Sequence, residues 1–175
     1  MDELIENEML AFLPRLRRFT HGLTGSAADG DDLLQATCER AIKNIDSWTK
    51  GSRLDSWMFR IARNLHLNDR RARGVRDSHL REIGHTQSMA VDGAAAQDSR
   101  LAYDAVRGFV ARLPEEQRAV LLLIAVEGLS YRETADILEV PMGTVTSRLA
   151  RARATLAALI DGDNVPGDAT EGARA

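Results

Sequence analysis

Apolar residues recur three and four positions apart over most of the chain, the spacing that gathers them on one face of an α-helix. The clearest stretch carries six of them on one face: Leu54, Trp57, Met58, Ile61, Ala62 and Leu65. Arginine and asparagine occupy most of its opposite face. Since no segment shows the strict alternation of a half-buried strand, the pattern predicts an all-α protein.

The same periodicity divides the chain into two small helical domains, residues 8–73 and 98–161. Residues 74–97 are rich in glycine, alanine and polar side chains, which predicts a flexible linker. Residues 162–175 hold too few apolar side chains for a core, which predicts a disordered tail.

Two further helices are expected before residue 54. The first has its apolar positions at Leu10, Phe12, Leu13, Leu16 and Phe19, with Pro14 unfavourable in its middle. The second starts near Asp29, and its buried positions are Leu34, Cys38, Ala41, Ile42 and Ile45. A loop, residues 46–52, then leads to the third helix, in which Trp57 is expected in the core, while Trp48 is the candidate for an exposed ring.

Helix-boundary residues define the second domain. A helix with Leu101, Ala105, Phe109 and Val110 is expected to end near Leu113. Pro114 suits the first position of the next helix, which should run from Glu115 to Glu127 and stop at Gly128. Ser130 and Glu133 then match a capping box.

A short helix through Leu138, a turn at Glu139 to Pro141 and a long helix from about Met142 to Ile160 form a helix-turn-helix pattern. The long helix is expected to face the core with Val145, Leu149, Ala152, Leu156 and Leu159. Its other side carries hydroxyls and guanidinium groups, and no acid occurs between Val140 and Ile160, in a chain of net charge −3. Because phosphates repel carboxylates and arginine binds guanine edges or phosphate, the pattern indicates DNA binding. A solvated helix face is the alternative.

Composition narrows the function classes. Cys38 is the only cysteine, so no internal disulfide forms, and a buried small side chain is its expected role. No apolar run approaches the roughly 20 residues of a membrane span, and the acidic N-terminus is no signal peptide, so we expect a cytoplasmic protein without membrane insertion. The four histidines lack metalloprotease spacing and no glycine loop cradles phosphate, so we expect no enzyme, no metal and no cofactor.

Five segments resemble, in order, those of the extracytoplasmic-function (ECF) sigma factors of bacterial RNA polymerase. Asp31–Ala41 resembles their polymerase-binding helix, and Ser56–Leu65 looks like the helix they use at the minus-10 element. Leu113–Arg118, Gly128–Ala135 and Gly143–Arg153 resemble their minus-35-binding domain. The likeness covers about residues 8–161.

The resemblance implies sigma region 2 and region 4 domains that carry RNA polymerase to a promoter and start transcription. Its implied partners are the clamp helices of the largest polymerase subunit, the polymerase flap, promoter DNA and an anti-sigma factor. Implied polymerase-binding residues are Asp31, Asp32, Gln35, Glu39 and Arg40. Implied minus-10 residues are Trp48, Lys50, Arg60, Arg63, Asn64, Asn68 and Arg71. Implied minus-35 residues are Thr144, Thr146, Ser147, Arg148, Arg151 and Arg153.

Two positions depart from the family pattern. Glu139 stands where the family often has glycine, which costs about 1 kcal/mol if the backbone there is left-handed. The loop of residues 48–52 is not the usual version. A stand-alone helix-turn-helix regulator remains an alternative function, although it leaves the first domain unexplained. A second alternative is an adaptor that only sequesters an anti-sigma factor. The intact DNA-binding face of the last helix argues against it.

Overall fold

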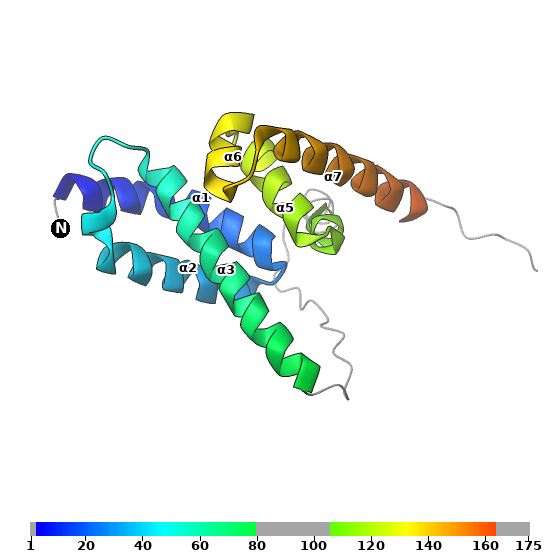
Figure 1. Cartoon of the computed structure of the whole chain (residues 1–175), viewed down its shortest axis with the longest axis horizontal. Coiled ribbons are helices and arrows are strands. Elements are labelled where there is room, and N and C mark those ends of the chain that lie inside the picture. The colour runs from blue at the N-terminus through cyan, green and yellow to red at the C-terminus, as the bar shows by residue number, and fades with distance from the viewer. Residues whose placement is uncertain (1–2, 80–105, 164–175) are drawn as a thin grey trace, which may run out of the picture.

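The computed structural model describes residues 3–79 and 106–163, and these residues form helices joined by turns and loops (Figure 1). The predicted all-α class is therefore confirmed. The first group of elements is α1 (Glu3–Thr24), α2 (Ala27–Lys43), the 3-10 turn η1 (Ile45–Ser47) and α3 (Leu54–His79). After a helical segment at residues 106–112 come α5 (Glu115–Leu121), the π-helical turn η2 (Leu122–Val126), α6 (Tyr131–Leu138) and α7 (Met142–Asp163). None of the described helices is long and apolar enough to cross a membrane.

The first three helices pack around an aromatic cluster. The Phe59 ring of α3 lies edge-on to two rings of α1, with centroids 5.0 Å from Phe12 and 4.9 Å from Phe19. Phe19 and Phe59 are completely buried, as are Leu16, Met58 and Ala62. Edge-to-face aromatic pairs contribute about 0.5–1.5 kcal/mol beyond their buried area. Phe59, which was not part of the predicted apolar face of α3, is therefore central to this core.

Gly30 allows α1 and α2 to approach closely. A Cβ atom at this position would lie 2.8 Å from Cα of His21, a backbone contact that cannot shift aside. Ser26 caps the start of α2, because its Oγ accepts a hydrogen bond from the Asp29 amide at 3.3 Å. The tight spacing fixes how α2 presents its outer face.

The structure corrects several details of the first domain. Leu10 and Ile42, expected in the core, are 56 % and 52 % exposed. Their helices bury a neighbouring stripe that includes Met9 in α1 and Thr37 in α2. Pro14 lies inside α1 on its exposed side, where water can serve the backbone carbonyl that proline leaves without a donor. Two boundaries also differ: α1 begins at Glu3, before residue 8, and α3 continues past residue 73 to His79.

Some predictions fall on residues that the structure does not describe. Residues 80–97 of the expected linker lie outside the described residues. So do Leu101 and Ala105, the first expected helical positions of the second domain, and residues 164–175 of the expected tail. At the tail's start, α7 extends three residues beyond Ile160, to Asp163.

The helix expected from Glu115 to Glu127 changes character midway. It is α-helical to Leu121 and then widens into the π turn η2, which the Glu127 amide closes on the Leu122 carbonyl at 3.0 Å. Pro114 sits at the N-cap of α5 rather than at its first helical position. A π turn contains one residue more than an α turn and re-aims the side chains that follow it. Glu127, directly after it, is buried.

The helix-turn-helix is formed as its sequence predicts. The Ser130 Oγ accepts from the Glu133 amide at 3.2 Å, and the Ser130 amide donates to Glu133 Oε2 at 2.8 Å, which confirms the capping box. On α7, Val145, Leu149 and Ala152 are buried as expected. The periodicity of α7 thus leaves its opposite side free for another use.

Glu139 lies in the left-handed region, with φ 55° and ψ 45°, and is the one non-glycine residue with positive φ in the described part of the chain. A left-handed conformation costs a residue with a Cβ roughly 1–2 kcal/mol. The turn between α6 and α7 therefore stores strain that its sequence does not relieve.

Substituting Glu139→Gly should raise the free energy of unfolding by about 1 kcal/mol, because glycine adopts this backbone without a steric penalty. Chemical denaturation measures the change. Glu139→Ala is the matched control, since it removes the same side chain but keeps the Cβ. Equal stability of the two variants would show that the backbone strain is not the cause.

Candidate nucleic-acid and polymerase interface

The helix α7 presents most of its predicted DNA-contacting residues to solvent. Thr146, Arg151 and Arg153 are exposed, and Thr144 and Ser147 are half-buried. The Ser147 hydroxyl donates to the Thr144 carbonyl at 3.1 Å, and the Thr146 hydroxyl to that of Met142 at 3.1 Å. The exposed part of this side, which Thr146, Arg151 and Arg153 form, is available to enter a groove.

Arg148 is held differently from its neighbours. Its side chain is 17 % exposed, and its Nη2 lies 2.6 Å from Oε2 of Glu116 on α5. A charge-assisted bond of this length fixes the direction of the guanidinium group. The Arg148 guanidinium group is therefore oriented by Glu116 and is less accessible than Arg151 and Arg153.

The basic side of α3 does not face solvent throughout. Arg60 Nη2 donates to the Asp136 carbonyl of α6 at 2.8 Å, and its Nε lies 4.0 Å from Glu139 Oε1. Burial lowers the pKa of Arg63, and carboxylates that include Glu139 oppose that shift. Asn64 is half-buried, whereas Asn68 and Arg71 are exposed. The structure thus separates the predicted minus-10 residues into a part covered by the second domain and an open part.

Trp48 is less accessible than expected for a base-stacking ring. It is half-buried against the core of the first domain, and its Nε1 is buried without a hydrogen-bond partner. Lys50, two residues on, is exposed. The loop of residues 46–52 therefore exposes the Lys50 ammonium group, whereas the Trp48 indole is packed against the first domain.

The outer face of α2 carries the predicted polymerase-binding residues, and all five are exposed: Asp31, Asp32, Gln35, Glu39 and Arg40. Gln35 Nε2 donates to Glu39 Oε1 at 2.9 Å, one helical turn along. They form a continuous polar stripe, which is the kind of surface a charged partner helix recognises.

Asp31 is already bound within the chain. Arg17 of α1 donates to both of its carboxylate oxygens, at 2.9 and 3.1 Å, and His21 Nε2 lies 2.7 Å from Oδ1. The hydrogen bonds from Arg17, then those from His21, lower the pKa of Asp31 to about 2. The carboxylate therefore ties α1 to α2 in addition to any contact it makes outside.

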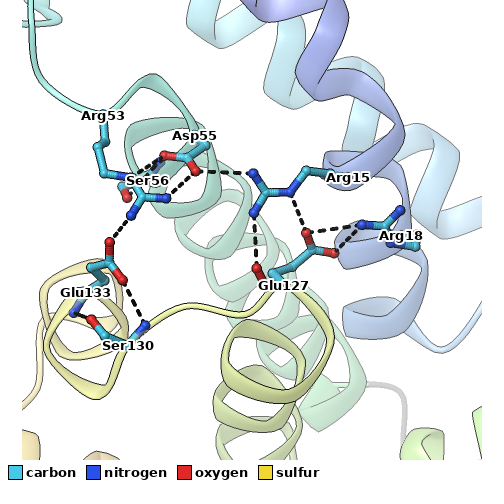
Figure 2. Close-up of polar contacts among 8 residues, drawn as sticks. All are labelled: Arg15, Arg18, Arg53, Asp55, Ser56, Glu127, Ser130 and Glu133. Atoms are coloured by element: carbon cyan, nitrogen blue, oxygen red, sulfur yellow. Dashed lines mark hydrogen bonds and ion pairs between the residues drawn. The ribbon is translucent and has the colours of Figure 1, made fainter.

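A buried carboxylate joins the two halves of the molecule (Figure 2). Glu127, whose side chain has no exposed surface, accepts at Oε2 from Arg15 Nε at 3.0 Å and from Arg18 Nη2 at 3.4 Å. Arg15 also donates to the Glu127 carbonyl at 3.2 Å and to Asp55 of α3 at 3.4 Å. Its guanidinium carbon lies 5.5 Å from the Phe12 ring centroid, so it also stacks on the aromatic core.

A second ion pair lies beside the first. Arg53, at the start of α3, contacts both Asp55 and the capping-box residue Glu133 of α6 (Figure 2). We call Arg15, Arg18, Arg53, Glu127 and Glu133 the interdomain ion-pair cluster.

Polar contacts also connect the two halves farther along α3, at His66 and Arg70. Glu115, at the start of α5, lies 3.5 Å from His66 Nε2 and 3.2 Å from Arg70 Nε. Burial lowers the pKa of His66 and so favours its neutral form. Arg118 is buried and donates to the carbonyls of Leu23 in α1, at 2.8 Å, and Ala111, at 2.6 Å; both lie near helix ends, where carbonyl groups lack a backbone donor.

The residues of the interdomain ion-pair cluster were not among the predicted site residues. In the sequence, these residues are indistinguishable from ordinary charged residues on helix surfaces. The one available signal is the position of Glu127, which follows an apolar run and precedes Gly128. An acid at the end of a buried segment needs a cation, but the sequence does not say which.

The second domain is a helix-turn-helix with a basic side. The first domain has an acidic outer helix, α2, and a basic helix, α3. Together they define a DNA-binding protein that also has a second macromolecular surface. Models of two families match the chain. Sigma-70, region 4, matches residues 103–156, and the Sigma2 domain of PhyR matches residues 9–63.

Similar proteins agree with both matches. The chain is 35 % identical over 160 residues to the ECF RNA polymerase sigma factor EcfG of Rhodopseudomonas palustris, covering 91 % of this chain and 87 % of that protein. The sigma factor RpoE of Bartonella quintana, solved with the anti-sigma factor NepR, superposes with a TM-score of 0.81 at 32 % identity, covering 93 % of this chain and 100 % of that one. CnrH, solved with the cytosolic domain of CnrY, shares the fold with a TM-score of 0.66 at 24 % identity, covering 93 % of this chain and 92 % of that one. The chain belongs to the ECF RNA polymerase sigma factors, a family of transcription initiation factors.

The contacts of Asp31 generate a pH-dependent prediction. Because its pKa is lowered to about 2, its carboxylate stabilises the fold above the unfolded value near 3.9, and that contribution is lost as the pH falls through about 2. Arg17→Gln should raise the midpoint of the Asp31 titration towards 3.9, as followed by carboxyl-carbon NMR.

Lys43→Gln, which removes one positive charge at the other end of α2, should leave that midpoint in place. A midpoint that does not move in Arg17→Gln would mean that Arg17 is not the source of the shift.

Proposed function

We propose that this sigma factor uses the exposed side of α7 for the minus-35 element, α3 with the preceding loop for the minus-10 element, and the outer face of α2 for core polymerase. The observation that carries the proposal is the structure of α7. Val145, Leu149 and Ala152 are buried, Thr146, Arg151 and Arg153 are exposed, and no acid lies between Val140 and Ile160. No other described helix has such a face.

For the minus-35 element, the residues are Thr144, Thr146, Ser147, Arg148, Arg151 and Arg153. Arg148 is the candidate for base recognition, because Glu116 fixes its direction. Arg151 and Arg153, which are more exposed, suit phosphates, whose contacts position a protein without reading sequence.

For the minus-10 element, the residues are Trp48, Lys50, Arg60, Arg63, Asn64, Asn68 and Arg71. The loop of residues 46–52 would hold an unstacked base, whose capture offsets part of the cost of melting. Trp48 would do so with the part of its ring that is not packed on the core.

For polymerase, Asp32, Gln35, Glu39 and Arg40 form the free part of the α2 stripe, and Asp31 supports it through Arg17. The partners are the clamp helices of the largest subunit and the polymerase flap. The polymerase supplies the bond chemistry, so the protein itself needs no catalytic group or cofactor.

Three broader assignments complete the proposal. The two domains are centred on residues 8–73 and 98–161; α1 and α3 extend the first to residues 3–79, and α7 extends the second to Asp163. The protein works in the cytoplasm beside the polymerase. An anti-sigma factor regulates it, which the complex of the similar Bartonella quintana RpoE with NepR supports.

Arg148→Ala should lower promoter-specific run-off transcription with purified core polymerase at least about fivefold, because a bidentate base contact contributes about 1–3 kcal/mol of discrimination. Core-polymerase binding, measured by co-purification, should not change. Arg148→Lys is the control that retains the charge but loses the forked geometry of the guanidinium group. Its transcription should lie between that of the parent and that of Arg148→Ala. Parent-level transcription from Arg148→Ala would remove this residue from the recognition surface.

Asp32→Lys should weaken co-purification with core polymerase, because it reverses one charge on the exposed α2 stripe. Glu8→Lys makes the same charge change on an exposed position of α1 and should bind like the parent. Binding of the two variants in equal amounts would show that the stripe is not the docking surface.

A further inference from the structure

We infer that Met142, together with the γ-methyl group of Thr146, contacts the C5-methyl group of thymine in the minus-35 element and so selects thymine over cytosine where α7 meets the base edges. This inference rests on the proposed function of α7. It deepens that function, because it assigns one chemical group of the DNA to two side chains of the helix.

Met142 is an apolar side chain left open to solvent at the start of α7. It is the first residue of the helix and is 57 % exposed. Among the described side chains of α7, the other large apolar one that is exposed is Ile160, near the far end of the helix. Single exposed apolar side chains are ordinary on protein surfaces, so the role of Met142 follows from its position and not from its exposure alone.

Thr146 lies one turn after Met142 on the same side of the helix, because residues four apart are neighbours on a helix surface. It is exposed, and its hydroxyl donates to the Met142 carbonyl at 3.1 Å. The hydroxyl proton is therefore already used within the helix, whereas the γ-methyl group has no such role. Met142 and Thr146 thus provide adjoining apolar groups on the open side of α7.

These two residues occupy the part of α7 that lies closest to base edges in a helix-turn-helix. In such proteins the N-terminal residues of the recognition helix contact the bases. Arg151 and Arg153 lie roughly 8 to 11 Å beyond Thr146 along the axis, at a rise of about 1.5 Å per residue. Their guanidinium groups suit phosphates, so the base edges are left to the side chains before them.

The chemistry of Met142 matches thymine better than cytosine. In the major groove, the thymine edge carries a methyl group at C5, whereas cytosine presents an amino donor for which a carboxylate is the matching acceptor. No Asp or Glu occurs between Val140 and Ile160, and the thioether of Met142 is at most a weak acceptor. A cytosine amino group placed against Met142 would lose water without gaining a partner, which is unfavourable.

A deoxyuridine scan tests the inference, because deoxyuridine pairs with adenine as thymidine does and lacks only the C5-methyl group. Holoenzyme is reconstituted from the full chain and core polymerase. Fluorescence anisotropy gives its dissociation constant for a promoter duplex whose start site has been mapped by run-off transcription. Each thymine of the upstream element, on both strands, is replaced singly. The parent should bind about three- to fivefold more weakly at one or two positions, which is the effect of losing one buried methyl group.

Met142→Ala is the decisive variant. It should bind the thymine duplex about three- to fivefold more weakly than the parent and should no longer respond to deoxyuridine at one of those positions, because the contact is already lost. Met142→Leu keeps an apolar side chain of similar size and should keep the response. Ile160→Ala is the matched control, since it removes an exposed apolar side chain at the other end of α7 and should also keep the response.

Thr146→Ser separates the methyl group from the hydroxyl. Serine can retain the hydrogen bond to the Met142 carbonyl and lacks only the γ-methyl group, so this variant should also reduce the response to deoxyuridine. Thr146→Val keeps a methyl group in that place and should retain the response. Circular dichroism establishes that each variant is folded, as expected for substitutions at exposed positions.

A parent holoenzyme that binds every deoxyuridine duplex as tightly as the thymine duplex would overturn the inference. So would an undiminished response in Met142→Ala, because another group would then contact the methyl group. Reduced co-purification of Met142→Ala with core polymerase, with the response intact, would identify Met142 as a protein contact instead. Failure of the proposed function has a different signature: replacing the whole upstream element with unrelated sequence would leave holoenzyme binding unchanged, which would overturn both.

Discussion

The position of the helix-turn-helix depends on the neutralisation of Glu127. A carboxylate without exposed surface costs several kcal/mol unless it is paired, so α1 must bring Arg15 and Arg18 to it. Arg15 in turn is fixed by the Phe12 and Phe59 rings beneath it, which belong to the core of the first domain. One chain of contacts thus runs from that aromatic core, through a guanidinium group, to the residue that ends η2. The π turn aims Glu127 at α1, and α6 begins four residues later, at Tyr131.

Features decided by nearby residues could be predicted from the sequence. The Ser130 and Glu133 capping box, the buried side of α7 and the all-helical class depend on spacings of three or four positions. Glu139 was expected to carry a cost because the resembled family often has glycine at this turn position, and its backbone is left-handed in the structure. The same local logic identified the acid-free side of α7 as a candidate surface, whereas the polar stripe of α2 was expected only from the family resemblance. The structure leaves Arg151 and Arg153 of α7 and the whole α2 stripe exposed.

Features decided by partners far along the chain could not be predicted. Arg15 and Glu127 are separated by 112 positions, and Arg118 and Leu23 by 95, so no helical periodicity reports on them. The residue type alone does not show whether a glutamate is buried or solvated. For the same reason, the sequence could not separate Arg60, which α6 covers, from Arg71, which remains free. The core role of Phe59 and the exposure of Leu10 and Ile42 depend on how three helices rotate against one another, which spacing defines only to within one position.

Arginine can serve both inside the closed molecule and on DNA because its planar group binds carboxylates, carbonyls and phosphates through the same donors. The two uses exclude each other at Arg60 and Arg63, but not at Arg151 and Arg153, which are exposed in the closed arrangement. In this arrangement, duplex DNA could therefore meet α7 while part of α3 is still covered. The part of α3 that contacts α6 would become available only when the two halves separate. Polymerase would bind the exposed face of α2 without displacing α6. It could therefore bind the protein whether α3 is covered by α6 or open.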